Sequence, residues 1–238
     1  MAGNPGFGRR AVEGPLKNNT GQGVQMNWFF RTFTASIGKK LVMAVTGLIF
    51  CLFLFVHLVG NLMIYRGGEE FVAYSEHLHS LGLLLNVIEW GLIICAVLHI
   101  CFAAVLFYEN WRARPVGYVV KKWAGGRTLS SATMPYTGLY LLVFVIIHLI
   151  NFHFADRSQQ SIYQIVFQAF SHPGYVIYYI FSMVVVAFHV RHGLWSAFQT
   201  LGLNHPKYMP FIRKASVVFG VIIGVGFGSI PIFLLSLA

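Results

Sequence analysis

Histidine is the residue whose type and position in this sequence most clearly indicate chemistry. The chain has ten histidines, and five of them lie well inside long apolar segments: His57, His99, His148, His189 and His192; His153 lies close to the end of one segment. An ionisable side chain at membrane depth is costly and is therefore a sign of function. A single such histidine is equally well explained by a hydrogen bond between helices. The positions of the five relative to one another decide between these interpretations.

The apolar segments that carry these histidines are long enough to cross about 30 Å of hydrocarbon as helices. There are five of them, over residues 41–65, 84–108, 136–154, 175–200 and 217–237. Only 10% of the chain is charged and 57% is hydrophobic, whereas about a quarter of a soluble domain is charged. The apolar runs are too continuous for the strands of a membrane barrel. We therefore predict an all-α fold, an integral-membrane bundle of five transmembrane helices.

The distribution of positive charge predicts the orientation of this bundle. Of 17 Lys and Arg residues, fourteen lie before the first span, between the second and third, or between the fourth and fifth. The two opposite loops hold only Arg66 and Arg157, and Arg191 lies inside a span. An excess of Lys and Arg marks cytoplasmic loops. We therefore expect a multi-pass protein of the cell inner membrane, with its N-terminus cytoplasmic and its C-terminus outside. The net charge of +10 then reflects topology and does not indicate a nucleic-acid partner.

In this orientation four of the histidines fall into two depth-matched pairs. At 1.5 Å per residue, His57 and His148 lie about 20–25 Å from the cytoplasmic edge, and His99 and His189 lie about 15 Å from it. Two histidines on facing helices at one depth can hold the iron of a flat macrocycle from both sides, as in electron-transfer b cytochromes. We predict two haem b groups, an outer one held by His57 and His148 and an inner one held by His99 and His189. His192, one turn from His189, stays open as the alternative inner ligand.

Other cofactors and classes of protein fit the spans less well. Zinc requires four ligands that converge on one point, and carboxylate-bridged iron requires several glutamates, of which the spans contain only Glu89. A transporter would show broken helices, midplane carboxylates or inverted repeats, and no convincing internal repeat is evident. A non-haem transporter, or the haem-bearing subunit of a hydrogenase, formate dehydrogenase or nitrate reductase, stays as the alternative function.

The chain divides into two parts of different composition. Residues 1–35 form a polar segment that ends in an expected interfacial anchor, Trp28, Phe29 and Phe30 followed by Arg31. Residues 36–238 form the expected five-helix di-haem domain.

From Ser36 to its end, the sequence resembles the five-helix, di-haem cytochrome b subunit of succinate dehydrogenase and fumarate reductase. The most specific motif is FHVRHGLWS in the fourth span, followed by QTLG. The other motifs are SIGKK at 36–40, AVTG at 44–47, FVHLVGN at 55–61, GGEEF at 67–71 and LHI at 98–100. The resemblance places an axial ligand on each of the first four helices and pairs the first helix with the third and the second with the fourth.

The resemblance also implies partners and a substrate. It implies a flavoprotein carrying FAD and an iron–sulfur subunit, both docked on the cytoplasmic side, and menaquinone or ubiquinone as the membrane substrate. The dicarboxylate reaction would take place on another subunit. Some fumarate-reducing members have a glutamate two residues before the fourth ligand, where this chain has Ala187. The direction of turnover and a dimer of complexes are left open.

Two further groups of polar residues are expected near the cofactors. A guanidinium matches a haem propionate bidentately, and the expected inner polar cluster is Arg191, His192, Ser36 and Lys40. The alternative for Arg191 is extension to the lipid headgroups. Hydrogen bonds and protons for the quinone are expected from Glu76, His77, His79 and Glu89. The alternative for this second group is a solvated outer surface.

Overall fold

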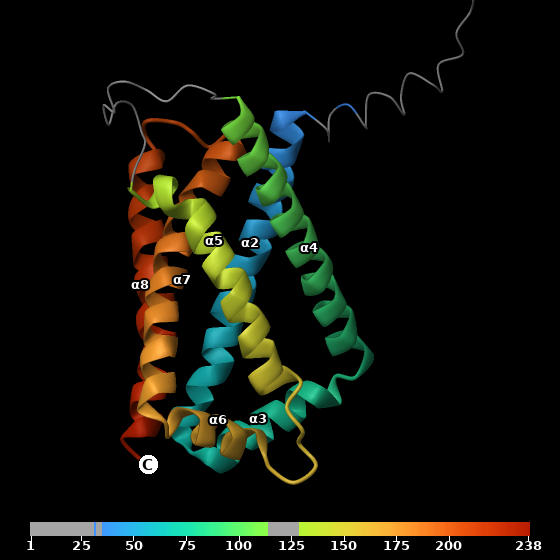
Figure 1. The fold of residues 1–238 in the computed structure, drawn as a ribbon, viewed down its shortest axis with the longest axis vertical. Coiled ribbons are helices and arrows are strands. Elements are labelled where there is room, and N and C mark those ends of the chain that lie inside the picture. The colour runs from blue at the N-terminus through green and yellow to red at the C-terminus, as the bar shows by residue number, and fades with distance from the viewer. Residues whose placement is uncertain (1–30, 32–34, 114–128) are drawn as a thin grey trace, which may run out of the picture.

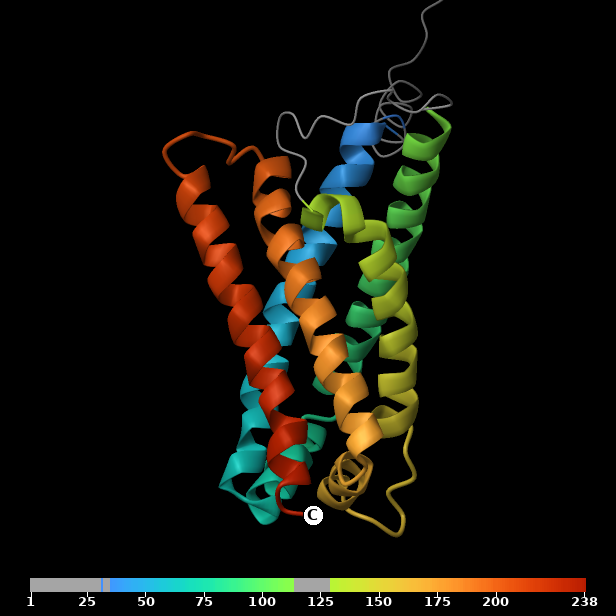
Figure 2. The same cartoon turned by 60° about the vertical axis from the view of Figure 1, so that its left-hand side comes forward.

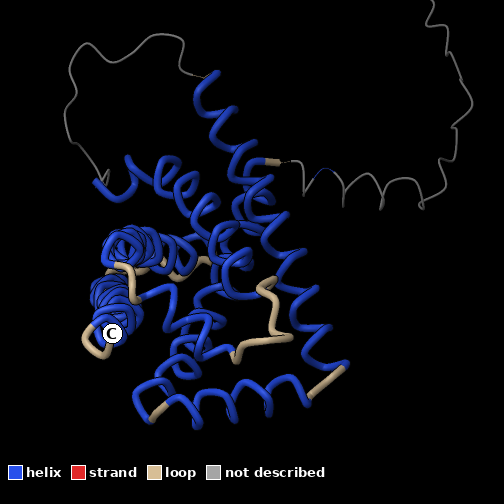
Figure 3. The backbone as a smooth tube through the Cα atoms, turned by 60° about the horizontal axis from the view of Figure 1, so that its bottom comes forward, coloured by secondary structure: helices blue, strands red, loops and turns tan. Residues whose placement is uncertain are grey.

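The computed structural model describes residue 31, residues 35–113 and residues 129–238. The expected anchor at residues 28–30 lies outside them. Five long helices make up the bundle: α2 (Ser36–Asn61), α4 (Leu83–Arg112), α5 (Leu129–His148), α7 (Pro173–Thr200) and α8 (Met209–Leu235). Short elements connect or extend them: the 3₁₀ turn η1 (Leu62–Arg66), α3 (Gly68–Ser80), the π-helical turn η2 (Leu149–His153) and α6 (Ile162–Phe170). Figure 3 shows that this described part of the chain consists of helices and loops, without strands.

The prediction of five apolar helices long enough to cross a membrane is confirmed. Three of them, α2, α5 and α8, begin at least five residues before their apolar runs do, and two of these starts carry charged residues. Helix α2 begins at Ser36 and includes Lys39 and Lys40, and α8 begins at Met209 and includes Arg213 and Lys214. Lys and Arg are good helix formers, so the helices continue beyond the apolar part of the sequence into these charged turns.

The bundle has two distinct ends (Figure 1). The starts of α2, α5 and α8 and the ends of α4 and α7 lie together at one end, which carries many basic residues and is called the basic end below. The opposite end carries the short helices α3 and α6 and the C-terminus, and is called the α3–α6 end. The long helices therefore run alternately between the two ends, as expected for a multi-pass bundle.

Helices α7 and α8 lie side by side (Figure 2) because small residues let them approach closely. A Cβ added at Gly220 would lie 2.9 Å from the backbone oxygen of Ala187, and one added at Gly224 would lie 2.9 Å from the Cβ of Ala187. Gly228 continues the same stripe and faces Met183. Small residues four apart are a typical way for helices to pack in lipid, where no hydrophobic force drives them together.

The buried core gathers toward the α3–α6 end. Leu58, Phe71, Phe144, Phe170 and Tyr179 are all buried there, on five different helices. Helix α4, by contrast, packs mainly against α2 and has no buried residue. A long apolar helix with this much exposed surface suits a non-aqueous environment such as lipid.

Candidate functional site

The structure brings His57 of α2 and His148 of α5 together at the level nearer the α3–α6 end. Their ring centroids are 6.1 Å apart and their planes are nearly perpendicular, at 89°. A metal–nitrogen bond is about 2 Å long and a ring nitrogen lies about 1 Å from its ring centre, so two imidazoles on one metal have centres about 6 Å apart. The observed separation fits an iron held between them. These two residues are called the α2/α5 pair below.

Aromatic side chains enclose the α2/α5 pair. Phe53 stacks on His57 at 5.2 Å, and Phe227 of α8 lies 5.4 Å from the same ring. Phe152 lies 5.3 Å and Phe144 5.9 Å from His148. Such apolar walls exclude water and suit a flat, largely apolar macrocycle.

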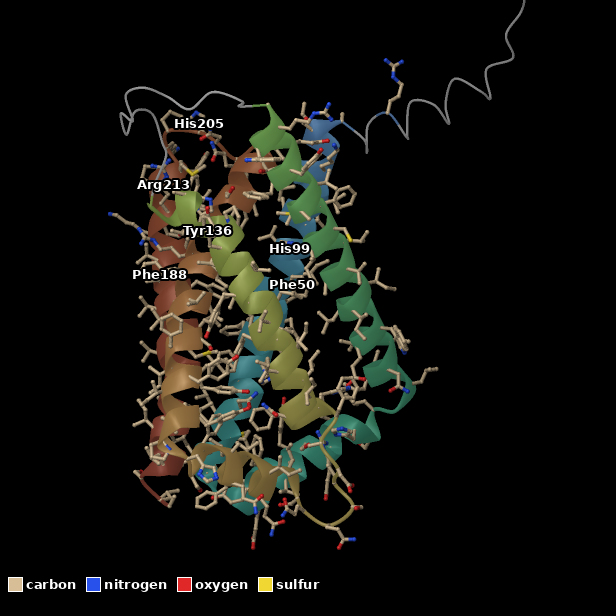
Figure 4. The ribbon with its side chains drawn as sticks, viewed as in Figure 1. Phe50, His99, Tyr136, Phe188, His205 and Arg213 are labelled. Carbon is tan, nitrogen blue, oxygen red and sulfur yellow. The ribbon has the colours of Figure 1, made fainter. Side chains whose placement is uncertain are left out.

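The other two predicted ligands, His99 of α4 and His189 of α7, lie nearer the basic end and form the α4/α7 pair. Nδ1 of His99 lies 2.9 Å from Oγ1 of Thr46 on α2, and Nδ1 of His189 lies 3.1 Å from Oγ1 of Thr137 on α5. Figure 4 shows His99 close to Phe50 of α2, and the two ring centroids are 5.7 Å apart. In both histidines the hydroxyl contact occupies Nδ1 and leaves Nε2 for a ligand.

The threonine contacts show that the bundle has two equivalent halves. Thr-Gly-Leu begins at Thr46 and again at Thr137, and each time a histidine follows eleven positions after the threonine, at His57 and at His148. The halves α2–α3–α4 and α5–α6–α7 each contain a long helix from the basic end, a short helix and a long returning helix. Each histidine pair thus consists of equivalent residues of the two halves. The sequence interpretation missed this repeat, and the Thr-Gly-Leu spacing was the signal that could have revealed it.

Of the expected inner polar cluster, His192 has the most informative surroundings. Its Nδ1 is buried and has no hydrogen-bond partner within the described residues, and its ring meets Trp195 edge-on at 5.0 Å. Arg191, Ser36 and Lys40 are exposed. An orphaned buried nitrogen is rare in native proteins and indicates a missing polar partner, which a carboxylate of a bound cofactor would fit.

An ion pair at the basic end was not predicted. Nζ of Lys39 on α2 bonds the carboxylate of Glu109 on α4. At the same end, the guanidinium of Arg213 lies over the ring of Trp195, 5.0 Å from its centre.

The residues expected near a quinone lie on α3 and at the start of α4, toward the α3–α6 end. Glu76 and His77 are exposed, and Glu89 is half-buried. His79 donates from Nδ1 to the carbonyl of Ser75 at 2.7 Å, and its Nε2 lies 3.3 Å from Nη1 of Arg157, which donates to it. This contact joins α3 to the loop between α5 and α6.

In the same loop, the backbone N–H of Ser158 donates to Oδ1 of Asp156 at 2.9 Å. This bond, with the hydroxyl of Ser158, holds the pKa of Asp156 below its ordinary value.

The geometry defines a helical membrane protein with two pairs of inward-facing histidines at two levels. A comparison with protein families identifies the particular group: the model of the succinate dehydrogenase/fumarate reductase transmembrane subunit matches residues 110–227, about half of the chain. The chain belongs to this family. It is a multi-pass membrane anchor subunit of a succinate dehydrogenase or fumarate reductase enzyme complex. Searches of curated proteins and of solved structures gave no match.

Membership carries two consequences. The family associates with a flavoprotein and an iron–sulfur subunit, and its members commonly bind haem b. The matched region contains His148, His189 and Thr137, whereas His57, His99 and Thr46 precede it. The first half of the bundle therefore has to be interpreted from its own geometry and from its equivalence to the second half.

Proposed function

We propose that this subunit holds two haem b groups and carries electrons between the iron–sulfur subunit and a membrane quinone. The observation that supports the proposal most strongly is the arrangement of four histidines as two pairs of equivalent residues. His57 and His148 would be the axial ligands of one haem, and His99 and His189 those of the other. Bis-histidine ligation leaves no open iron position, so the groups supply one-electron transfer and not substrate binding at the metal.

The orientation proposed from the positive charges places the basic end in the cytoplasm. The flavoprotein, with its FAD, and the iron–sulfur subunit would then dock there, next to the haem of the α4/α7 pair. The haem of the α2/α5 pair would lie toward the outer face. The two levels thus form a path for electrons across the membrane.

The exposed ends of the two haems need polar partners. Around the inner haem we propose Arg191, His192, Ser36 and Lys40 as partners of the propionates, and the orphaned Nδ1 of His192 supports this choice.

For menaquinone or ubiquinone we propose a site at the α3–α6 end, with Glu76, His77, His79 and Glu89 as sources of hydrogen bonds and protons. The contact between His79 and Arg157 supports an ordered polar surface there.

A haem count on the purified complex tests the proposal. A pyridine haemochrome assay should give two haem b per copy of this chain, and a value of one or zero would defeat the proposal. Replacement of either member of a pair, as in His57→Ala or His99→Ala, should remove one haem and leave the other. His205→Ala is the matched control, because His205 is an exposed loop histidine, and it should keep both haems.

A further inference from the structure

We propose that Thr46 and Thr137 are positioning residues that fix the tautomer and the donor strength of His99 and His189. This inference rests on the proposed haem ligation and goes beyond it, because it predicts that the two haem sites differ electronically. It starts from hydrogen bonds of the two threonines.

Each threonine hydroxyl has one proton, and in each case a backbone carbonyl takes it. Oγ1 of Thr46 donates to the carbonyl of Val42 at 2.7 Å, and Oγ1 of Thr137 donates to the carbonyl of Met134 at 3.0 Å. A hydroxyl has one donor and two acceptor positions, so towards the imidazole it can only accept. The proton of each histidine must therefore lie on Nδ1, and Nε2 presents its lone pair.

Among the described residues, the α2/α5 pair has no equivalent arrangement. Within this part of the chain, the hydrogen-bonding contact of the His148 ring is with the Tyr179 hydroxyl, 3.5 Å from Nδ1. Asn61 donates its main hydrogen bond to the backbone carbonyl of His57 at 2.8 Å, and its amide nitrogen lies 3.4 Å from both ring nitrogens. At such lengths these are weak contacts.

A hydrogen bond from Nδ1–H to an acceptor makes the opposite ring nitrogen a stronger electron donor and fixes the orientation of the ring. A stronger donor stabilises the oxidised metal. The threonines should therefore lower the reduction potential of the haem at the α4/α7 pair, with no such effect at the α2/α5 pair.

The repeat explains why both threonines occur. Helices α2 and α5 each supply a ligand at one level and, eleven residues earlier in the sequence, the threonine that supports a ligand at the other level. Because the two threonines are equivalent and each acts on one histidine, loss of either should give a similar shift. Loss of both should give a shift close to the sum of the two.

The test is a redox titration of the purified complex, followed by haem absorbance. The variants are Thr46→Val, Thr137→Val and the double variant, which replace the hydroxyl with a methyl group of similar size. The His99→Ala variant identifies which haem belongs to the α4/α7 pair. We expect that haem alone to titrate at a higher potential in the valine variants, and we expect Thr46→Ser and Thr137→Ser to restore it. Thr200→Val is the control, since its hydroxyl donates to the carbonyl of Ser196 on its own helix, and neither potential should change.

Equal shifts of both haems, or no shift in the double variant, would overturn the inference. If a valine variant loses the haem, retention in the serine variant supports the hydroxyl's role, and loss in both overturns it. The haem count of the unaltered complex separates this result from the larger proposal: two haems without a selective shift refute only the role of the threonines.

Discussion

The hydrogen bonds of individual residues give the two histidine pairs of the bundle different surroundings. Thr46 and Thr137 each orient an imidazole of the α4/α7 pair, whereas aromatic rings such as Phe53 and Phe152 surround the α2/α5 pair. A polar partner at a ligand histidine raises its donor strength, and apolar rings do not. The difference between the two levels therefore comes from a few side chains and not from the helices themselves.

The ion pair between Lys39 and Glu109 is a second effect at this scale. Its lysine side chain is only 12% exposed and its glutamate 43%, and the pair ties the start of α2 to the end of α4. We expect Lys39→Met to lower the unfolding free energy by up to about 1 kcal/mol, the upper range for exposed pairs. Thermal unfolding of the detergent-solubilised complex measures the effect.

A charge swap provides the control for this pair. The double variant Lys39→Glu with Glu109→Lys should recover most of the lost stability, and Lys214→Met, at an exposed lysine of α8, should change little. If the single variant is as stable as the unaltered protein, the ion pair does not hold α4 in place.

At the scale of whole helices, the stripe of Gly220, Gly224 and Gly228 determines how closely α8 approaches α7. This contact is the most extensive between any two helices among the described residues. Helix α8 carries no haem ligand in the proposed assignment. Its role is to support α7, which carries His189, and to place Phe227 against His57.

Filling this stripe should disturb the bundle. Gly220→Val would force the added Cβ against the backbone oxygen of Ala187, and backbone cannot move aside cheaply. We expect a loss of about 1–3 kcal/mol, as for other overpacked interiors, measured as a lower unfolding temperature of the purified complex. Gly91→Ala on α4 meets open space and should be neutral or slightly stabilising. Equal stability of the two variants would mean that the α7–α8 contact is looser than described.

Helix positions could be predicted from the sequence far better than helix contacts could. The apolar runs located all five long helices, because the hydrophobic thickness of a membrane fixes their length. The ion pair of Glu109 with Lys39, and not with the adjacent Lys40, shows where this reasoning stops. Neighbouring residues on a helix point about 100° apart, and only packing against α4 decides which of them meets Glu109. That His57 and His148 lie at one level of the bundle could be predicted, because the level depends on residue number alone. The side chains around them could not be predicted, because they depend on how the helices pack.

The whole molecule combines two similar halves with one asymmetric addition. The halves α2–α3–α4 and α5–α6–α7 carry equivalent histidines at matching positions, so each proposed haem would lie between the halves and belong to both. Helix α8 is present once and packs mainly against α7, with a smaller contact to α2. Among the described residues, α4 has no such covering helix, and the polar surfaces at the two ends differ. The two equivalent histidine pairs therefore lie in unequal surroundings.

The orientation of the whole molecule makes a prediction that is independent of any cofactor. If the basic end faces the cytoplasm, the loop between α5 and α6 faces outward, and the loop between α7 and α8 faces inward. In a chain whose native cysteines, Cys51, Cys95 and Cys101, are replaced by alanine, Ser158→Cys should react with a membrane-impermeant maleimide in intact spheroplasts. Lys207→Cys should react only after permeabilisation. Both positions are exposed, so access to the reagent and not burial decides the outcome. The reverse labelling pattern would mean that the basic end lies on the outer face of the membrane. The soluble subunits would then dock on that face.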